Sequence, residues 1–492
     1  MILSLGKEEF HFKKRMKSLK RKTAANVFPE RILQFGAGNF MRGFIDWIVQ
    51  ELNQKTDFNS GVIAVKPTNR GNYDELKSQE GAYTLFLKGI KNGKPQSEYS
   101  IIDCIQRVVN PYKNHVEYLS CAKNPDLRFV FSNTTEAGII YEKNDKLSDT
   151  PQSSFPGKLT AFLYHRFQHF MGEKTKRGLI IIPFELIEKN GQTLRKIILQ
   201  HAKDWRLGKD FINWIIEHNF FCDTLVDRIV PGFPKTEEVE ITTELGYSDK
   251  LMVVGEQFHL LIIQGPPVLR NELPTEKCGL NVVFTDNLEP YRTRKVRILN
   301  GAHTTLVPVG YLYGIDNVRE SLEDPIVGSF LKDAVFKEIC PTLNQSEQEL
   351  DQFSRDVLDR FRNPYLEHAL LSISLNSISK YKTRILPSVL DYIKRKNALP
   401  KRLLFSLAAL IAFYKGERNT EPIPLKDTQE VLDFYHKLWS NNNYETIVNN
   451  VLSNTEFWNT DLTKYDGLED FVTICLANIM DKGMKEALKM FS

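Results

Sequence analysis

The sequence predicts an α/β protein in which a doubly wound parallel sheet is followed by a mostly α-helical C-terminal domain. Three observations predict this fold class. The 492-residue chain is too long for one hydrophobic core, because cores stop growing near about 250–300 residues. In the first half, short apolar runs alternate with helical patterns, as buried parallel strands alternate with their crossover helices. Beyond residue 285, helical patterns dominate.

The first half predicts four buried strands. RILQFGAG (31–38) is apolar and ends in glycines, GVIAVKP (61–67) is stopped by proline, and the runs at 127–136 and 178–185 both enter polar loops. The segment 39–55 between the first two strands has apolar residues at helical spacing, namely Phe40, Phe44, Trp47, Ile48 and Leu52. Strands joined by helices pair in parallel, so we expect a doubly wound sheet.

The second half predicts a helical domain. Its helical patterns cover 291–313, 325–340, 347–362, 366–379, 386–397, 401–415, 427–438 and 467–489. The longest apolar run, at 403–414, is short of the ~20 residues that span a bilayer, so a core helix is expected there. We expect a lead-in over 1–27, a first domain over 28–285 and a helical domain over 286–492.

Composition excludes several classes of protein. A formal net charge of +4, spread over 65 basic and 61 acidic residues, predicts no nucleic-acid binding. Because the longest apolar run is too short to span a bilayer, we expect no membrane partner. The basic run Lys13–Lys22 is interpreted as a solvated lead-in, with a nucleic-acid-binding arm as the alternative. Six scattered cysteines without a CxxC pair indicate reduced thiols. The N-terminus turns charged too soon for a signal peptide, so we expect a soluble, cytoplasmic protein.

A glycine loop, GAGNFMRGF (36–44), lies where the first strand gives way to a helix. Glycines let the backbone approach a pyrophosphate, and the first helical turn offers N–H groups and a positive dipole end. The loop is therefore a candidate dinucleotide cradle of a Rossmann-type domain, with a purely structural turn as the alternative. Met41 stands where GxGxxG has its third glycine, and Arg42 is expected to contact a phosphate instead.

The end of the second strand does not decide the cofactor. An acidic residue about 20 positions beyond the loop would favour NAD. Here Lys66 and Arg70 come first, and Asp74 and Glu75 come later. We expect NAD, and NADP stays open.

The run KVRILNGAH (295–303) places a lysine, an asparagine and a histidine in an apolar helix. On an ideal α-helix at about 100° per residue, His303 lies about 80° and Asn300 about 140° from Lys295, on one broad face. Hydride transfer to a carbonyl needs a proton donor and neutral donors at the oxygen, and these three side chains supply them without a metal. The alternative is structural, in which Lys295 reaches solvent, Asn300 caps a turn and His303 belongs to the core.

Two further patterns rank lower. HRFQH places His165 and His169 four residues apart, but no glutamate follows His165, so we expect no zinc site and no other metal. KYKTR carries Lys380, Lys382 and Arg384 and is either a solvated turn or a site for an acidic substrate.

With these motifs in hand, the chain resembles the long-chain polyol dehydrogenases of the mannitol dehydrogenase family from about Pro29 to the C-terminus. The K-x4-N-x2-H pattern of Lys295, Asn300 and His303 is the family's specific mark. The resemblance is carried by ERILQFGAGNFMRGFIDW (30–47), RFVFSNTTEAGI (128–139), IIIPFELIEKNG (180–191), TLVDRIV (224–230), KVRILNGAHTTLVPV (295–309), DRFRNPYLEH (359–368), SKYKTRILP (379–387) and LAALIAFYKGERN (407–419).

The resemblance implies zinc-independent hydride transfer with Lys295 as general acid/base, while Asn300 and His303 hold the reacting oxygen. It implies a dinucleotide site that includes a loop at the nicotinamide end. The expected cofactor-binding residues are Phe35, Gly36, Ala37, Gly38, Asn39, Phe40, Arg42, Thr135 and Glu136. The expected substrate-binding residues are Asn190, Asp227, Arg362, Lys380 and Arg384.

Two departures from the family pattern bear on the substrate. Where polyol-oxidising members carry a DN pair, this chain has Glu185 and Leu186, so a second oxyanion asparagine is missing and Asn190 is one candidate to replace it. Those members also carry an arginine eight positions before the lysine that corresponds to Lys380, and this chain has Ser372 at that position. Both changes favour a hexuronate over mannitol, and a basic residue is expected to meet its carboxylate.

The resemblance therefore implies reversible, NAD-dependent reduction of tagaturonate to altronate, a small-molecule sugar acid. Fructuronate or a neutral polyol is the alternative substrate. A dinucleotide-sensing protein without catalysis is the alternative of another class, and the intact lysine, asparagine and histidine set argues against it. The oligomeric state stays open.

Overall fold

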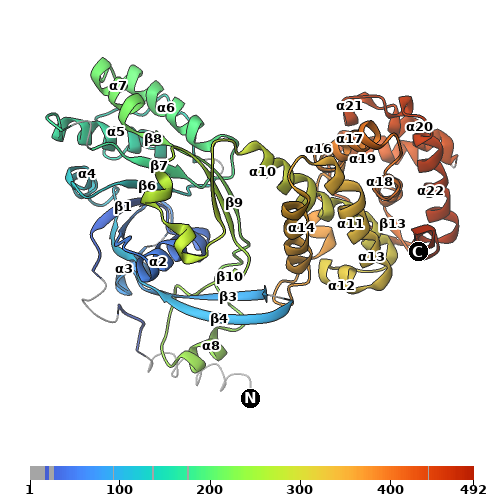
Figure 1. Cartoon of the computed structure of the whole chain (residues 1–492), viewed down its shortest axis with the longest axis horizontal. Coiled ribbons are helices and arrows are strands. Elements are labelled where there is room, and N and C mark those ends of the chain that lie inside the picture. The colour runs from blue at the N-terminus through green and yellow to red at the C-terminus, as the bar shows by residue number, and fades with distance from the viewer. Residues whose placement is uncertain are drawn as a thin grey trace. The chain divides into compact units, whose positions relative to one another are not determined.

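The computed structural model describes residues 17–21, 27–71, 73–91, 93–135, 138–173, 177–440 and 443–491 (Figure 1). The chain divides into two compact units. Unit 1 comprises residues 1–88 and 96–288, and unit 2 comprises residues 89–95 and 289–492. Within the described ranges, no helix is both long and apolar enough to cross a membrane. None of the six cysteines forms a disulfide, as their spacing predicted.

Unit 1 is built around a six-stranded sheet in the order β5-β2-β1-β6-β7-β8, with every neighbouring pair parallel. The strand order reverses beside β1, which is the doubly wound arrangement whose ligands bind at the carboxyl ends of the strands. The strands are β1 (Glu30–Phe35), β2 (Gly61–Val65), β5 (Ile105–Val109), β6 (Phe129–Ser132), β7 (Ile180–Pro183) and β8 (Phe220–Phe221). The four predicted strands are confirmed as β1, β2, β6 and β7, each shorter than predicted.

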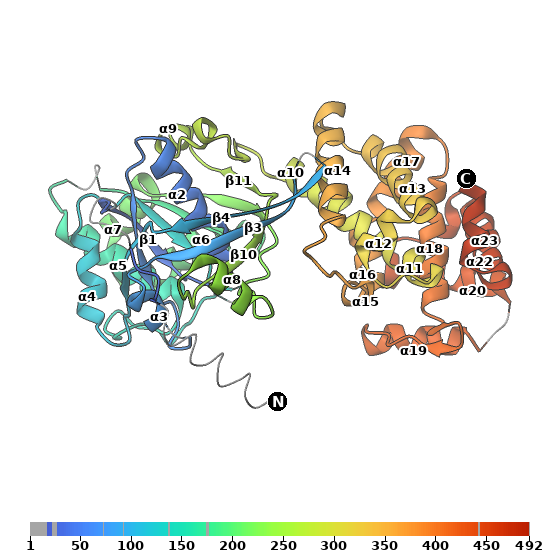
Figure 2. The same cartoon turned by 90° about the horizontal axis from the view of Figure 1, so that it is seen from below.

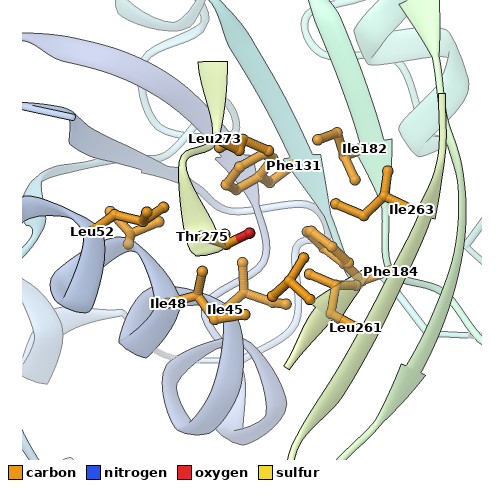
Figure 3. A pocket seen from close by; sticks show the side chains of 12 residues that line it. Ile45, Ile48, Leu52, Phe131, Ile182, Phe184, Leu261, Ile263, Leu273 and Thr275 are labelled. Atoms are coloured by element: carbon orange, nitrogen blue, oxygen red, sulfur yellow. The ribbon is translucent and has the colours of Figure 1, made fainter. Parts of the chain in front are cut away.

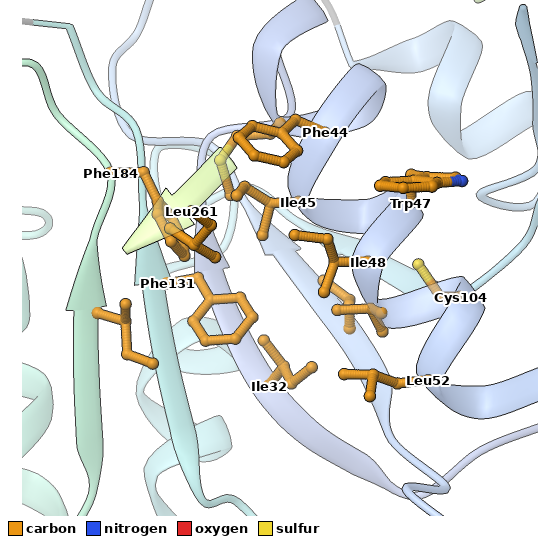
Figure 4. Close-up of a cluster of buried hydrophobic side chains, with 14 of the residues drawn as sticks. Ile32, Phe44, Ile45, Trp47, Ile48, Leu52, Cys104, Phe131, Phe184 and Leu261 are labelled. Carbon is orange, nitrogen blue, oxygen red and sulfur yellow. The ribbon is translucent and has the colours of Figure 1, made fainter. Parts of the chain in front are cut away.

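Both faces of this sheet are buried, because successive side chains point to opposite sides and both sides are covered. Ile32 and Phe131 point toward Ile48 and Leu52 of α2 (Asp46–Lys55), as Figure 4 shows. The opposite face packs against a second group of helices. These are α4 (His115–Ser120), α5 (Phe155–His169), α6 (Asn190–Asp204) and α7 (Lys209–His218).

Two smaller sheets were not predicted; both belong to unit 1 except for the residues of β3 and β4 within 89–95, which belong to unit 2. One has the order β10-β3-β4, visible in Figure 2, and the other has the order β12-β11-β9. β4 is exposed over most of its length, so its sequence lacks the apolar alternation that marks a half-buried strand. The strands are β3 (Tyr83–Lys91), β4 (Lys94–Ile102), β9 (Asp223–Asp227), β10 (Val253–Glu256), β11 (Leu260–Gln264) and β12 (Val282–Thr285).

Within Lys17–Arg21 the prediction of a solvated lead-in is wrong for Leu19 and Arg21, while Lys17, Ser18 and Lys20 are exposed as predicted. Leu19 is buried, and its amide donates to the Ser248 carbonyl at 2.9 Å. The Arg21 guanidinium donates to Gln106 at 2.8 Å, which fixes this basic residue on unit 1. The rest of the basic run, Lys13–Met16 and Lys22, lies outside the described residues.

Unit 2 is largely helical. Its buried centre is α18, whose residues from Leu403 to Phe413 are all buried, which confirms the predicted core helix. The helices include α10 (Glu289–Arg294), α11 (Gly301–Tyr313), α12 (Val318–Glu323), α13 (Pro325–Asp333), α14 (Glu347–Phe361), α15 (Leu370–Ile373), α16 (Ser377–Arg384), α17 (Leu386–Lys396), α18 (Lys401–Phe413), α19 (Gln429–Leu438), α20 (Tyr444–Leu452), α21 (Thr455–Trp458), α22 (Leu468–Lys482) and α23 (Met484–Leu488).

Two predicted helices are wrong as continuous segments. The segment 366–379 is divided into α15 and α16, because Asn376 has a left-handed backbone with φ of 53°. The segment 467–489 is divided into α22 and α23 at Gly483, whose φ of 82° breaks the helix. A residue in the left-handed region interrupts the helical hydrogen bonds in both places.

A small apolar cavity lies between α2 and the sheets of unit 1 (Figure 3). Its volume of ≈ 20 Å³ admits at most one water molecule, so it is a packing defect and not a substrate pocket. The Thr275 hydroxyl faces this cavity, and it has no hydrogen-bond partner among the described residues. A buried hydroxyl without a partner destabilises the folded state.

We therefore expect Thr275→Val to raise the free energy of unfolding by about 1 kcal/mol, because a methyl group suits the apolar wall better. Thr224→Val is the matched control, since the Thr224 hydroxyl donates to the Pro183 carbonyl at 2.6 Å. The control should lower the free energy of unfolding. Urea denaturation of both variants measures the difference, and a Thr275→Val protein less stable than wild type would contradict the argument.

Candidate active site

The glycine loop begins with a glycine that the fold requires. Gly36 has φ of 105°, and a Cβ there would lie 2.7 Å from the Asn133 carbonyl oxygen. Two backbone bonds fix this approach, because Gly36 N–H donates to the Val65 carbonyl at 3.1 Å and Asn133 N–H donates to the Phe35 carbonyl at 3.0 Å. Loops from three adjacent strand ends therefore meet at Gly36.

Gly38 differs from Gly36, because a Cβ at Gly38 would meet no atom of the described chain within 4 Å. Gly38 and Asn39 are exposed, and the first helical hydrogen bond runs from Arg42 N–H to the Gly38 carbonyl at 3.1 Å. A glycine followed by the start of a helix offers an anion open space and backbone N–H groups. This geometry fits the pyrophosphate of a dinucleotide.

Arg42 is expected to contact a phosphate, and the structure places it beneath the loop. Its largely buried guanidinium donates to Asn39 Oδ1 at 2.8 Å and lies over the Tyr83 ring, 5.5 Å from the centroid. The Tyr83 hydroxyl lies 3.0 Å from the Arg42 carbonyl and 3.2 Å from the Asp46 carboxylate, and burial raises the pKa of Asp46 to about 7. Arg42 thus supports Asn39, and direct phosphate contact stays a prediction.

The helix after the loop departs from an ideal α-helix. Met41–Ile45 forms a π-helical turn, and Met41 is fully buried at the place of the third glycine. Gly43 takes over that glycine's packing role, because a Cβ there would lie 2.6 Å from a Val230 methyl group. Sequence reasoning missed Gly43, although the third glycine of GAGNFMRGF was the available signal.

The end of β2 holds a lysine where an acid would favour NAD. Lys66 follows Val65 directly, is buried, and donates to the Asn69 carbonyl at 3.3 Å. Asp74 and Glu75 start the short helix α3 (Asp74–Ser78), beyond this turn. The strand end therefore gives no preference for a 2′-hydroxyl over a 2′-phosphate.

The loop after β6 contains Thr135, which is exposed and has φ of 81°. A β-branched residue in this region is strained, and such strain concentrates at functional sites. Glu136, the other residue expected at the nicotinamide end, lies outside the described residues.

Asn190 does not fit the expected role of a second oxyanion donor. It is fully buried, and its Nδ2 group lies within 3.0 Å of the Pro183 carbonyl, the Glu185 carbonyl and the Thr224 hydroxyl. An amide nitrogen has two hydrogens, and acceptors within the protein occupy both. Asn190 therefore holds the loop after β7, and its predicted contact with substrate is wrong on this geometry.

Asp227, the expected supporting carboxylate, ends β9 and is largely buried. It pairs with Leu260 of β11 in an antiparallel ladder. Its position on a paired strand gives its backbone a fixed orientation, and its contact with substrate stays a prediction.

The lysine helix of unit 2 also contains a π-helical turn, over Lys295–Asn300 (η6), and continues as α11. Gly301 N–H donates to the Val296 carbonyl, five residues back. The ideal α-helical angles expected from the sequence are therefore wrong here. Bonds over five residues widen the turn and bring Lys295 and Asn300 closer to the same face than an α-helix would. Both side chains are half-buried.

His303 lies one turn further along, half-buried between Phe361 and His368. The centroid of the His303 ring lies 4.0 Å from that of Phe361 and 5.1 Å from that of His368. Burial lowers the pKa of His303 well below its usual value, and the nearby His368, Arg360 and Arg384 lower it further. The ring donates to the Leu299 carbonyl, while Nε2 is buried without a partner among the described side chains and backbone. His303 is therefore a neutral ring whose Nε2 can accept a hydrogen bond.

Two of the three predicted carboxylate-binding residues lie beside this helix. A Cβ at Gly301 would be in ordinary contact with the Arg384 carbonyl oxygen, at 3.4 Å, and the Arg384 guanidinium lies 3.4 Å from the Thr304 hydroxyl. Lys380, one turn earlier on α16, donates to the Ile373 carbonyl at 2.6 Å. Burial lowers the pKa of both basic groups, and Arg384 also lowers that of Lys380.

The third predicted residue, Arg362, is not among the basic groups that act on His303. Its guanidinium lies 3.7 Å from the Asp359 carboxylate. Arg360 and His368, which sequence reasoning missed, do act on His303. The motif DRFRNPYLEH contained both residues, but their orientation depends on the end of α14 and the loop beyond it. Among the described residues, no group of three or more His, Cys, Asp and Glu side chains is placed to hold a metal ion.

Two family models match the chain. The model described as the mannitol dehydrogenase Rossmann domain matches residues 30–277. The model described as the mannitol dehydrogenase C-terminal domain matches residues 287–480.

Curated relatives match nearly the whole chain. Altronate oxidoreductase of Enterobacter sp. (strain 638) is 47% identical over 469 residues, which cover 94% of this chain and 97% of that protein. Altronate oxidoreductase of Bacillus subtilis (strain 168) is 47% identical over 466 residues, which cover 94% and 95%.

Solved structures share the fold at lower identity. A substrate-free D-sorbitol dehydrogenase gives a TM-score of 0.79 at 22% identity and covers 97% of this chain and 99% of that one. The second structure is mannitol 2-dehydrogenase of Pseudomonas fluorescens in a ternary complex with NAD and D-mannitol. It gives a TM-score of 0.63 at 20% identity, and the match covers 97% of this chain and 97% of that one. These likenesses show a Rossmann domain joined to a largely helical domain, as predicted.

The two loop glycines give a direct test of the dinucleotide site. Gly38→Ala should leave the melting temperature near that of wild type but weaken NADH binding by about tenfold or more, because the methyl group enters the space left for phosphate. Gly36→Ala should instead lower stability by about 1–3 kcal/mol through strain and the Asn133 clash. Calorimetric titration and thermal melts measure both effects. Unchanged NADH affinity in Gly38→Ala would exclude the loop as the cradle.

Proposed function

Because the chain belongs to the mannitol dehydrogenase family, we propose that it is an NAD-dependent tagaturonate reductase, or altronate oxidoreductase, of hexuronate catabolism. Altronate oxidoreductases that match the chain along nearly its whole length support this reaction. The single observation that carries the proposal is the arrangement of Lys295, Asn300 and His303 beside the basic residues of α16. We also propose a cytoplasmic location, as the reduced thiols favour.

The glycine loop of unit 1 binds the dinucleotide in this proposal. Gly38 leaves room for the pyrophosphate, and the helix that begins at Asn39 faces it with N–H groups. When bound, NADH supplies the hydride that reduces the substrate carbonyl carbon. The choice of NAD over NADP rests on the family and is not favoured by the end of β2.

Lys295 is the general acid of the reduction and protonates the carbonyl oxygen as the alcohol forms. Asn300, brought toward Lys295 by the π-helical turn, donates a hydrogen bond to the same oxygen. His303 has a different role from the one expected. Its neutral Nε2 accepts a hydrogen bond from a neighbouring substrate hydroxyl, because its other nitrogen already donates to Leu299. In the reverse direction, Lys295 takes the proton from the alcohol.

The substrate carboxylate is met by Arg384, with Lys380 one helical turn away. Both groups are basic and lie within unit 2, and a planar guanidinium can bind a carboxylate with two hydrogen bonds. A neutral polyol would leave that charge without a counterpart. These two basic groups therefore favour a keto-uronate over mannitol or fructose.

Lys295→Ala should lower kcat by about a thousandfold or more with NADH affinity unchanged, because the variant loses the proton donor but keeps the dinucleotide loop. Stopped-flow turnover and fluorescence titration of NADH measure the two quantities. Lys337→Ala, which removes an exposed lysine of unit 2, is the control and should retain wild-type kcat. Comparable turnover in Lys295→Ala would overturn the assignment.

Arg384→Gln should raise KM for tagaturonate by about 10–100-fold, the effect of losing one charge-assisted hydrogen bond to a carboxylate. Any slow reduction of neutral fructose should be unaffected. Arg362→Gln serves as the comparison, because Arg362 is paired with Asp359 and should change KM by less than about threefold. Steady-state kinetics decide between them, and the reverse ranking would move the carboxylate site to Arg362.

A further inference from the structure

Glu185 is a buried carboxylate that the proposed reaction does not use. It follows β7, is 2% exposed, and lies against the loop after β6. One carboxylate oxygen accepts hydrogen bonds from Thr134 N–H and the Thr134 hydroxyl, both at 2.9 Å. The other accepts from the Ser132 hydroxyl at 3.0 Å. Three hydrogen bonds thus join the Glu185 side chain to the end of β6 and to the loop that follows it.

The loop that Glu185 binds is under strain. Thr135, the next residue, has φ of 81°, and Gly138 N–H donates to its carbonyl at 2.9 Å. A Cβ at Gly138 would collide with the Thr134 hydroxyl, so the turn packs closely on itself. A strained backbone persists when neighbouring groups hold it, and Glu185 provides such bonds to Thr134.

The backbone of Glu185 is itself fixed. Its carbonyl accepts from Asn190 Nδ2 at 3.0 Å, and Asn190 Oδ1 accepts from Thr224 N–H at 2.9 Å. Asn190 therefore links Glu185 to Thr224 of β9. Glu185 in turn binds Thr134 in the loop after β6.

The position of this loop assigns it to one half of the coenzyme. In a doubly wound sheet the pyrophosphate lies at the first strand end and the adenosine ribose lies near the end of the second strand. The nicotinamide half then extends over the opposite strands, which are β6 and β7 here. The loop abuts the cradle directly, because the Asn133 carbonyl sets the approach of Gly36.

We infer that Glu185 is a positioning residue for the nicotinamide end of the coenzyme, acting through the Thr134–Thr135 turn. This inference rests on the proposed dinucleotide chemistry. The carboxylate fixes Thr134, Thr134 sets the strained Thr135, and Thr135 presents an exposed edge to the nicotinamide. Burial raises the pKa of Glu185, and the hydrogen bonds from Thr134 and Ser132 oppose this rise.

The test compares two ligands that differ in the nicotinamide ring. Glu185→Ala should weaken NADH binding by about tenfold, because the turn loses its anchor and Thr134 N–H its acceptor. Binding of ADP-ribose, which lacks the nicotinamide, should change by less than about twofold. Glu185→Gln should restore NADH affinity to within about threefold, because an amide oxygen still accepts the two Thr134 bonds.

A matched control separates positioning from general loss of stability. Asp249 is an equally buried carboxylate of unit 1 that accepts from Thr84 N–H, Leu251 N–H and Gln79. Asp249→Ala should lower the melting temperature as Glu185→Ala does, yet leave the ratio of NADH to ADP-ribose affinity at the wild-type value. For tagaturonate at saturating NADH, Glu185→Ala should lower kcat and raise the isotope effect with C4-deuterated NADH, and Asp249→Ala should do neither.

Equal loss of NADH and ADP-ribose affinity in Glu185→Ala would overturn the inference. The inference would also be overturned if Glu185→Gln bound NADH as weakly as Glu185→Ala does. The negative charge of Glu185, and not its hydrogen bonds to Thr134, would then determine NADH affinity. The proposed function and the role of Glu185 can be contradicted independently of each other. Absence of keto-uronate reduction by wild type would overturn the proposed function, while the two titrations would still report on Glu185.

Discussion

The close approach of Gly36 to the Asn133 carbonyl is the contact on which the candidate coenzyme site depends. It exists because β1 pairs in parallel with β2 and β6, so the carboxyl ends of three strands meet at one edge. A side chain at residue 36 would separate the first loop from the loop after β6. Glu185 then ties that second loop to β7, so the pyrophosphate and nicotinamide ends are set by one connected group of strand ends.

A π-helical turn occurs in both helices that carry the chemistry. In unit 1 the turn at Met41–Ile45 follows the phosphate loop, and in unit 2 the turn at Lys295–Asn300 carries the general acid. A widened turn changes which side chains share a face, and such turns are frequent at functional sites. A glycine lies within or just after each turn, and Gly43 lets Val230 approach closely. The two sites therefore share a local construction although they belong to different units.

The sequence predicted the parts of the fold that depend on local pattern. The buried parallel strands β1, β2, β6 and β7 are continuous apolar runs, and α18 is an apolar helix, so each was found. The exposed strand β4 has no such pattern and was missed. In the site, the types of Lys295, Asn300 and His303 predicted the chemistry, but the π-helical turn altered their geometry. Asn190 was misassigned, and Glu185 was noted but given no role, because only long-range contacts with Thr224 and Thr134 reveal what each side chain binds.

The central claim is that this chain reduces a keto-uronate with NADH, using Lys295 to protonate the oxygen and the basic residues of α16 to select a carboxylate. Its most direct test measures kcat/KM for tagaturonate, fructuronate and fructose, with NADH and NADPH in parallel. The account predicts that tagaturonate with NADH gives the highest value and that fructose is poorest. A higher value for fructose than for either keto-uronate, or no turnover of any of the three, would contradict it.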